Sequence, residues 1–293
     1  MRRIEGFIDL NRMLTKKEIK LYDHDYDFIP SRVSSFIDDN NDIYFFKESM
    51  MSEPYNELLA EELLKDFNLP HAEYDLAIYG NRKGVITKSF IDKNKKYYFG
   101  ENIIKDYNKA LNKEFDVTDN NLENIWDALE YKYRDNPNKE IIVSHLMNQI
   151  VDMYIFDILT GNCDRYYWNY QIEEGKEGIN IAPIYDSEAI MINTNNPSFF
   201  VAGDIDKNNK PNLYEELEKF ISYSESSYID RIKDKLWIIS GKNIDSVLER
   251  VEKKIGYEIP DELAVEYIKG FLEHKEKLEE LLNKLDKGNS RGK

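Results

Sequence analysis

Cysteine is nearly absent from this sequence: Cys163 is the only one among 293 residues. A single cysteine excludes an intramolecular disulfide, which is typical of proteins from reducing compartments. The N-terminal segment 1–14 lacks the continuous apolar core of a signal peptide, because Glu5 and Asp9 interrupt it. We also find no apolar run that approaches the ~20 residues needed to cross a bilayer. We therefore expect a soluble, cytoplasmic protein.

Positive charge is scarce as well. The chain has 40 Lys and Arg residues against 56 Asp and Glu residues, a net charge of −16. A field of that sign does not attract nucleic acid, so we expect no direct nucleic-acid partner, although a local basic cleft can still hold phosphates. Hydrophobic residues make up 41% of the chain, enough for a sizeable core in one large or two modest domains.

The first part of the chain has the pattern of a β-rich unit with one helix. Residues 41–49 form a short apolar run, which is typical of a strand covered on both faces. Residues 54–70 have helical periodicity. Residues 72–91 have the pattern of two strands, with Asn81 and Gly84 flanking the turn between them.

The pattern becomes helical after about residue 95. Residues 139–159 are apolar on almost every side, which predicts a central buried helix. Two short strands follow, joined by a turn that contains Gly175 and Gly178. We therefore predict an α+β chain of two lobes, a small β-rich N-lobe over residues 1–92 and a larger, mainly helical C-lobe over residues 93–293.

A lysine and a glutamate form the first half of a candidate site. Lys47 ends the predicted strand and shares parity with Ile43 and Phe45, so its side chain is directed to their face of the sheet. A buried ammonium group needs a partner. Glu57, at the edge of the packing face of the next helix, is the predicted partner, and Glu61 is the alternative.

The second half of the candidate site lies after the central helix. Asp164 and Asn169 share one polar turn, and Asp186 follows a predicted strand seventeen positions after Asn169. Asn169 and Asp186 would then lie on the two arms of one hairpin, near Asp164. A lysine, a glutamate, an Asp-x-x-x-x-Asn loop and a strand-end aspartate together form the set of groups that phosphoryl transfer requires. In that chemistry Asp164 is the base, and Asn169 and Asp186 bind Mg²⁺.

These segments resemble the HipA-like serine/threonine kinases. GNCDRYYWN (161–169) is similar to the Asn-x-Asp-Arg-His-x-x-Asn loop of that family, and IAPIYDSEA (181–189) to its Ala-Pro-x-Tyr/Phe-Asp metal-binding segment. YNELLAEELLKDFNLPHAEYDLA (55–77) is similar to its helix and the strand that follows. The resemblance extends from about residue 30 to about residue 200 and is weaker in the C-terminal helices.

The resemblance implies a two-lobed protein-kinase-like fold and ATP with Mg²⁺ as cofactors. It also implies phosphoryl transfer to Ser or Thr of a protein substrate. The founding members are toxins that a helix-turn-helix antitoxin holds in check, so the resemblance implies a possible antitoxin partner. By position, Lys47 would contact the α- and β-phosphates and Glu57 would pair with it. Asp164 would be catalytic, and Asn169 and Asp186 would bind Mg²⁺.

The sequence departs from the family pattern in several places. The longer toxins carry an additional N-terminal subdomain, for which the sequence before Lys47 is too short, so we expect a short form. Tyr166 replaces the histidine that usually follows Asp-Arg, and Cys163 replaces an arginine. The phosphate loop is expected at residues 30–36, PSRVSSF, which contains no glycine. In this loop the candidate nucleotide-binding or autophosphorylated serines are Ser31, Ser34 and Ser35.

Three functions fit these features. A HipA-like protein kinase uses every residue of the constellation. A small-molecule or lipid kinase on the same fold also uses an Asp-Arg-x-x-x-Asn-type loop. A nucleotide-binding pseudokinase would account for the loop without glycine.

Overall fold

The computed structural model describes residues 3–4, 6–22, 33–49, 53–115, 121–162, 165, 168–187, 189–190, 213–223 and 227–289. Its strands are β1 (Arg3–Ile4), β2 (Phe7–Asp9), β3 (Ile19–Leu21), β4 (Val33–Asp38), β5 (Ile43–Glu48), β6 (Tyr74–Tyr79), β7 (Arg82–Lys88), β8 (Lys96–Phe99), β9 (Gln171–Gly175) and β10 (Gly178–Ile181). Its helices are α1 (Leu10–Thr15), α2 (Glu53–Asp66), α3 (Gly100–Ala110), α4 (Leu122–Lys132), α5 (Lys139–Thr160), α6 (Leu213–Tyr223), α7 (Ser227–Leu236), α8 (Gly241–Ile255) and α9 (Asp261–Asn289).

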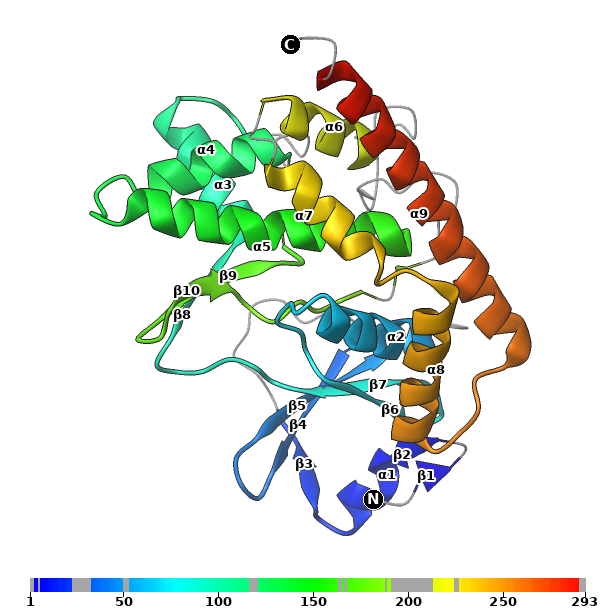
Figure 1. The fold of residues 1–293 in the computed structure, drawn as a ribbon. Helices are drawn as coiled ribbons and strands as arrows, with labels where there is room; N and C mark the ends of the chain where they lie inside the picture. The colour runs from blue at the N-terminus through cyan, green and yellow to red at the C-terminus, as the bar shows by residue number, and fades with distance from the viewer. Residues whose placement is uncertain are drawn as a thin grey trace.

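The strands form two sheets. Seven of them make a sheet of order β1-β2-β6-β7-β5-β4-β3, in which the β2–β6 pair is parallel and the other pairs are antiparallel. The smaller sheet, β10-β9-β8, is antiparallel throughout. Figure 1 shows the seven-stranded sheet at one end of the molecule and helices α3 to α7 at the other. The predicted α+β organisation, with a β-rich part followed by a helical part, is confirmed.

The register of β5 decides which side chains share the face of Lys47. Lys47 lies opposite Val33 on β4 and Val85 on β7, so these three side chains share one face. Leu76 on β6 lies opposite Val85 and is buried in the main core with the apolar side of α2. Phe46, one position before Lys47, is buried in a separate cluster on the other face, which α1 covers. The sheet therefore buries its Lys47 face against α2 over part of its width.

Helix α5 is the central helix of the protein, as its sequence predicts. Its bounds, Lys139–Thr160, nearly match the predicted 139–159, and every residue from Ile150 to Thr160 is buried. By length and composition it is also apolar enough to cross a membrane, which differs from our expectation. Of its most apolar 18-residue window, 67% is buried inside the protein, as in the core helix of a packed domain.

Helix α8 lies against α2, although about 190 residues separate them along the chain (Figure 1). Helix α9 then extends from that side of the molecule to the helical end, where it packs against α5 and α6. The C-terminal segment, which we assigned to the helical lobe, therefore also contacts the β-rich lobe. The boundary at residue 92 stays a prediction.

The hairpin between β6 and β7 differs from its prediction in the position of the turn. The turn is formed by Gly80 and Asn81, and Gly80 has a φ of 62°, which glycine adopts without strain. Gly84 does not flank the turn but lies inside β7, opposite Glu48 and Ala77. A Cβ at Gly84 would overlap the backbone carbonyl of Lys47. Glycine is therefore needed here because the two strands approach closely.

Replacing Gly84 by alanine is expected to lower the free energy of unfolding by about 1–3 kcal/mol, because β5 or β7 must shift to admit the methyl group. Chemical denaturation measures the loss. Gly241→Ala is the matched control, since a Cβ at Gly241 meets nothing within 4 Å. Equal stability of the two variants would contradict the close approach of β5 and β7.

Candidate functional site

The predicted catalytic loop begins where α5 ends. Gly161 closes the helix in the left-handed conformation, with a φ of 64°. The N–H of Asn162 then donates to the carbonyl oxygen of Asp157 (2.9 Å), and its side-chain amide donates to the Asp157 carboxylate (2.7 Å). Asp157 lies in the last turn of the most buried helix, so it attaches the start of the loop to the core.

Arg165 connects this helix to the loop that contains Asn169 and to the segment that contains Asp186. Its guanidinium is 1% exposed and donates to the Asp157 carboxylate at 3.1 and 3.2 Å. It also donates to the carbonyl oxygens of Asn169 (3.0 Å) and Tyr185 (2.9 Å) and to Oγ of Ser187 (3.0 Å). One side chain therefore fixes the loop at Asn169 relative to the residues on either side of Asp186.

The Asp157–Arg165 pair is fully buried, which sets its electrostatics. Burial raises the pKa of Asp157, and the charge of Arg165 opposes that rise. Burial also opposes the charge on Arg165, but Asp157 outweighs it and the pKa of Arg165 is raised. Because six donor–acceptor contacts compensate its desolvation, we take the guanidinium to remain charged and the pair to be ionised near neutral pH.

Lys47 and Glu57 both contact the segment that contains Asp186. The ammonium group of Lys47 forms an ion pair with the Asp186 carboxylate, and both side chains are partly exposed, at 20% and 31%. Glu57 is 1% exposed and accepts a hydrogen bond from the N–H of Ser187 (3.0 Å). The two residues are thus attached to consecutive positions of one segment. A direct pair between Lys47 and Glu57 stays a prediction.

Asp186 has an unusual backbone conformation. Its φ is 58°, in the left-handed region that costs most residues roughly 1–2 kcal/mol and that Asp and Asn tolerate best. Its N–H donates to the hydroxyl of Tyr74 (3.2 Å). The next residue is held by Glu57 and Arg165. These contacts fix the conformation that directs the Asp186 carboxylate toward Lys47.

The remaining predicted residues lie as follows. Asn169 is buried, and Arg165 links its backbone to the Asp186 segment. Asp164 and Ser31 lie outside the described residues. The expected loop at 30–36 is wrong from Val33 onward, because Val33 begins β4.

Strand alternation then separates the two described serines of this segment. Ser35 is buried on the face of Lys47, opposite Phe45. Ser34 lies on the other face, where its Oγ accepts from Arg82 (3.4 Å). Only Ser35 therefore shares the side of the sheet on which Lys47 lies.

An aromatic cluster borders the loop on its outer side. The rings of Phe90 and Tyr185 lie 5.7 Å apart, and the Tyr185 hydroxyl donates to the carbonyl oxygen of Trp168 (2.6 Å). Trp168 itself is 40% exposed and directly precedes Asn169. Residues 89–95, which join the two sheets, therefore reach the predicted catalytic loop through the contact of Phe90 with Tyr185.

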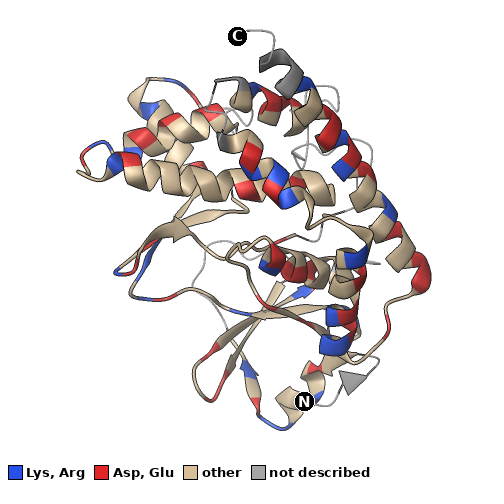
Figure 2. Cartoon of the chain, viewed as in Figure 1, with Lys and Arg blue, Asp and Glu red and all other residues tan. Residues whose placement is uncertain are grey.

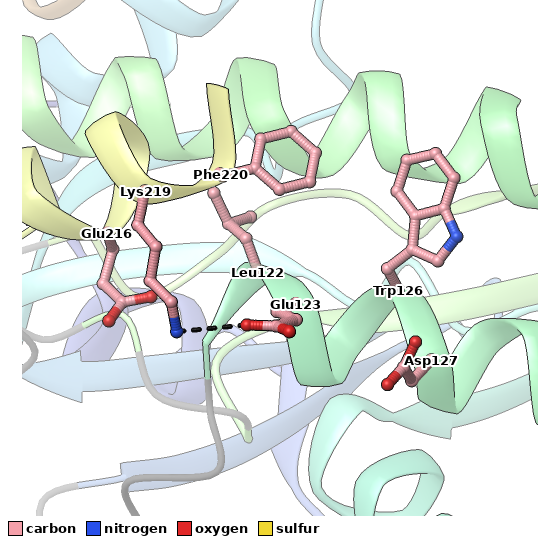
Figure 3. A pocket seen from close by; sticks show the side chains of 7 residues that line it. All are labelled: Leu122, Glu123, Trp126, Asp127, Glu216, Lys219 and Phe220. Carbon is pink, nitrogen blue, oxygen red and sulfur yellow. Dashed lines mark ion pairs between the residues drawn. The ribbon is translucent and has the colours of Figure 1, made fainter. Parts of the chain in front are cut away.

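A cavity lies away from these residues, between α4 and α6. This cavity of ≈ 220 Å³ has an apolar floor of Leu122, Trp126 and Phe220, and Lys219 bridges its rim to Glu123 at 3.0 Å (Figure 3). It contains no residue of the predicted constellation.

Comparison with solved structures identifies the fold. The chain is similar to a proinflammatory kinase of Helicobacter pylori, CtkA, with a TM-score of 0.63 at 19% identity over 90% of this chain and 97% of that one. The fold is that of a kinase. The chain is also similar to HipA of Shewanella oneidensis MR-1, solved with HipB and operator DNA, with a TM-score of 0.50 at 13% identity over 94% of this chain and 71% of that one. The resemblance to HipA-like kinases is thereby confirmed at the level of the fold.

No protein-family model matches the sequence, and no curated protein matches it. The kinase fold is therefore shared at identities below 20%, where the arrangement of strands and helices is retained while most side chains differ.

The donor set of the site fits Mg²⁺. The Asp186 carboxylate and the Asn169 amide oxygen are the hard oxygen ligands that Mg²⁺ prefers, and nucleotide-dependent Mg²⁺ sites commonly use one or two carboxylates together with substrate phosphates. In this structure the Asp186 carboxylate pairs with a cation, the ammonium group of Lys47. Among the described residues, no cluster of three His, Cys, Asp or Glu side chains suits a metal, so the phosphates would have to complete the coordination.

The sequence did not reveal Asp157, Tyr74 and Arg165 as organisers of this site. Arg165 lies in the predicted polar turn, but its partners lie 4 to 22 positions away, and spacing alone does not identify them. Asp157 had one available signal, an acidic residue on a helix that is otherwise apolar on almost every side. A buried carboxylate needs a cation, and Arg165 is the nearest arginine that follows it.

Replacing Arg165 by methionine is expected to lower the free energy of unfolding by about 3–5 kcal/mol, because the buried Asp157 carboxylate loses its cation. The double variant that also carries Asp157→Asn should lose less than the sum of the two single losses. Lys269→Met, which removes an exposed pair with Glu273, is the control and should cost less than about 1 kcal/mol. Equal losses for Arg165→Met and Lys269→Met would contradict the network.

The pH dependence of stability should report on His274, which packs against the start of the loop. A Cβ on Gly161 would lie 2.6 Å from Nε2 of His274, and burial lowers the pKa of His274 to about 4. Folding therefore favours the neutral imidazole. Its contribution to stability is complete above the unfolded pKa of about 6.5 and is lost as the pH falls toward 4.

We expect wild-type protein to lose up to about 3 kcal/mol from this group between pH 7 and pH 4. A His274→Gln variant should have a smaller acid-dependent loss over the same interval, measured by urea denaturation at each pH. Parallel stability curves for the two proteins would contradict the burial of a neutral imidazole.

Proposed function

We propose that this protein is an ATP- and Mg²⁺-dependent kinase that transfers a phosphoryl group to Ser or Thr of a protein substrate, as the HipA-like resemblance implies. One observation carries the proposal: strand β5, helix α2, the loop after α5 and the segment after β10 converge on Asp186. Lys47 pairs with its carboxylate, Glu57 holds the following N–H, and Arg165 joins both sides to Asn169. The kinase fold of the two structural relatives supports this interpretation.

The proposed roles follow from these positions. Asp164 orients the attacking hydroxyl and accepts its proton. Asn162 and Arg165, which lie before and after it in the sequence, are both hydrogen-bonded to Asp157 and so hold the two ends of its segment. Asn169 and Asp186 hold Mg²⁺, which, when bound, offsets the charge of the phosphates.

Lys47 contacts the α- and β-phosphates, which requires it to exchange the Asp186 carboxylate for phosphate oxygens. The exchange is feasible because the Lys47–Asp186 pair is partly exposed and therefore incompletely desolvated. Val33, Phe45 and Thr87 lie on the same sheet face as Lys47 and are half-buried. They offer a mainly apolar wall for the nucleotide base.

A protein partner is a further part of the proposal. The HipA structure contains HipB and operator DNA. We propose that this chain, in the cytoplasm, has a helix-turn-helix antitoxin as a possible partner and does not itself contact DNA, since its net charge is −16.

The pure protein is incubated with ATP labelled at the γ-phosphate, with Mg²⁺ and with a cell extract depleted of its own ATP. Labelled protein bands are expected. Asp164→Ala and Asp186→Asn should each lower the transfer rate at least about a hundredfold, through loss of the base or of a metal ligand. Asp135→Asn is the control, because the Asp135 side chain is 91% exposed. The intact mass of the kinase records self-phosphorylation in the same samples.

The other outcomes separate the alternatives. Label on a metabolite or lipid, with none on protein, would replace the protein kinase by a small-molecule or lipid kinase. Mg²⁺-dependent nucleotide binding without transfer would indicate a pseudokinase. Asp164→Ala transferring at the wild-type rate would contradict the assigned base.

A further inference from the structure

Acidic residues of helix α2 contact two different segments of the protein. Glu57 faces the Asp186 segment, while Glu61, Glu62 and Asp66 face the basic residues of α8. Figure 2 shows Asp and Glu along α2 and Lys and Arg along the neighbouring α8. Glu57 and Glu61 are four positions apart, so they lie on adjacent turns of one face. Contacts made at Glu61 therefore bear on the turn that holds Glu57.

Glu61 is a buried carboxylate with three partners. Lys254 on α8 donates to both of its oxygens, at 2.7 and 2.8 Å, and Lys65 donates to Oε1 at 2.8 Å. Oε2 also accepts the N–H of Tyr74 at 2.8 Å, where β6 begins. Glu61 thus ties three elements together: α2, which carries it, α8 and the first residue of β6.

Tyr74 continues this connection to the candidate site. Its backbone is held by Glu61, and its hydroxyl accepts the N–H of Asp186 at 3.2 Å. The ring is 7% exposed, and burial raises the pKa of Tyr74 well above its usual value, so the phenol stays protonated. A buried aromatic ring anchored at its backbone has little freedom, so the position of its hydroxyl follows that of β6.

We infer that Lys254, Glu61 and Tyr74 form a hydrogen-bonded relay that positions Asp186, and that α8 thereby sets the metal-binding competence of a site nearly 70 residues away in sequence. The relay has three consecutive links: Lys254 to Glu61, Glu61 to the Tyr74 N–H, and the Tyr74 hydroxyl to the Asp186 N–H. Its last link holds Asp186 in the left-handed conformation. All three are positioning residues, and the inference rests on the proposed function for its consequence in Mg²⁺ binding.

Arg250 reinforces the same interface one turn earlier on α8. It donates to the Glu62 carboxylate (2.8 Å) and to the Asp66 carboxylate (2.9 Å). These contacts hold α2 and α8 together without reaching Tyr74. They therefore provide stability to the interface, whereas Lys254 is the α8 residue that reaches the relay.

The test uses the full chain with two relay variants and two matched controls. Tyr74→Phe removes only the hydroxyl, and Lys254→Met removes the ammonium group. Tyr79→Phe alters the same strand on its opposite face, and Lys253→Met alters the exposed neighbour of Lys254. Lys254→Arg should restore the pairing with Glu61 and serves as the conservative rescue.

Amide hydrogen exchange of a peptide covering residues 184–187 is measured first, without nucleotide. Tyr74→Phe and Lys254→Met should accelerate exchange of this segment about threefold to tenfold, the effect of losing one hydrogen bond. The controls and Lys254→Arg should exchange at the wild-type rate. An unchanged rate in both relay variants would overturn the inference even if their melting temperatures fall, since a purely structural role predicts that pattern.

The Mg²⁺ concentration for half-maximal binding of a non-hydrolysable ATP analogue is measured second. It should rise about threefold to tenfold in Tyr74→Phe and Lys254→Met, as expected for residues that orient a metal ligand, and stay constant in the controls. If wild-type protein binds no analogue, the proposed function fails while the exchange result still decides the relay. Faster exchange with an unchanged Mg²⁺ midpoint would confirm the contacts and overturn their role in metal binding.

Discussion

The candidate site depends on one buried ion pair, that of Asp157 with Arg165. A guanidinium in the protein interior is tolerated only when most of its donors are satisfied, and here they reach the Asp157 carboxylate, two backbone carbonyls and one hydroxyl. Asp157 belongs to the least exposed part of α5, so the core helix determines where Arg165 lies. Arg165 in turn determines where the Asn169 loop and the Asp186 segment meet. Misplacing the ion pair would therefore separate the two predicted metal ligands.

The charges around this pair bear on how an acidic chain would hold the nucleotide that we propose. Among the described residues, Asp157, Glu57 and Asp186 contribute three carboxylates, and Lys47 and Arg165 contribute two cations. Arg165 is committed to Asp157 and to backbone groups. Lys47 is the partly exposed cation that can change partner. If Lys47 moved to a phosphate, as we propose, the Asp186 carboxylate would be open to a divalent cation, and that cation would restore the local balance of charge.

Much of this arrangement could be predicted from local sequence pattern. The apolar run that ends in Lys47, the helical periodicity around Glu57 and the hairpin before Asp186 are each local signals, and a strand, a helix and a hairpin form at these places. The missing parts are tertiary. No spacing rule connects Glu61 to Lys254, which lie 193 positions apart, or Tyr74 to Asp186, which lie 112 positions apart.

Two errors have different causes. Ser34 and Ser35 were treated as one loop, but β4 begins at Val33, so adjacent residues point to opposite faces of the sheet. Gly84 was taken for a turn residue because glycine commonly marks turns. Glycine is needed at this position because β5 approaches closely. That approach depends on strand pairing across the sheet, which the neighbouring sequence does not indicate.

The C-terminal helices give α2 a second set of constraints that the candidate site alone does not require. The apolar side of α2 is held by the sheet, and its acidic side is held by Arg250 and Lys254. Since α9 continues from α8 to α5, the same segment also reaches the helix that positions Arg165. The two halves of the site, Lys47 with Glu57 and Arg165 with Asn169, are therefore connected through α8 and α9 as well as through residues 89–95. A displacement of α8 would be transmitted to Asp186 from both directions, by Glu61 and Tyr74 on one side and by α5 on the other.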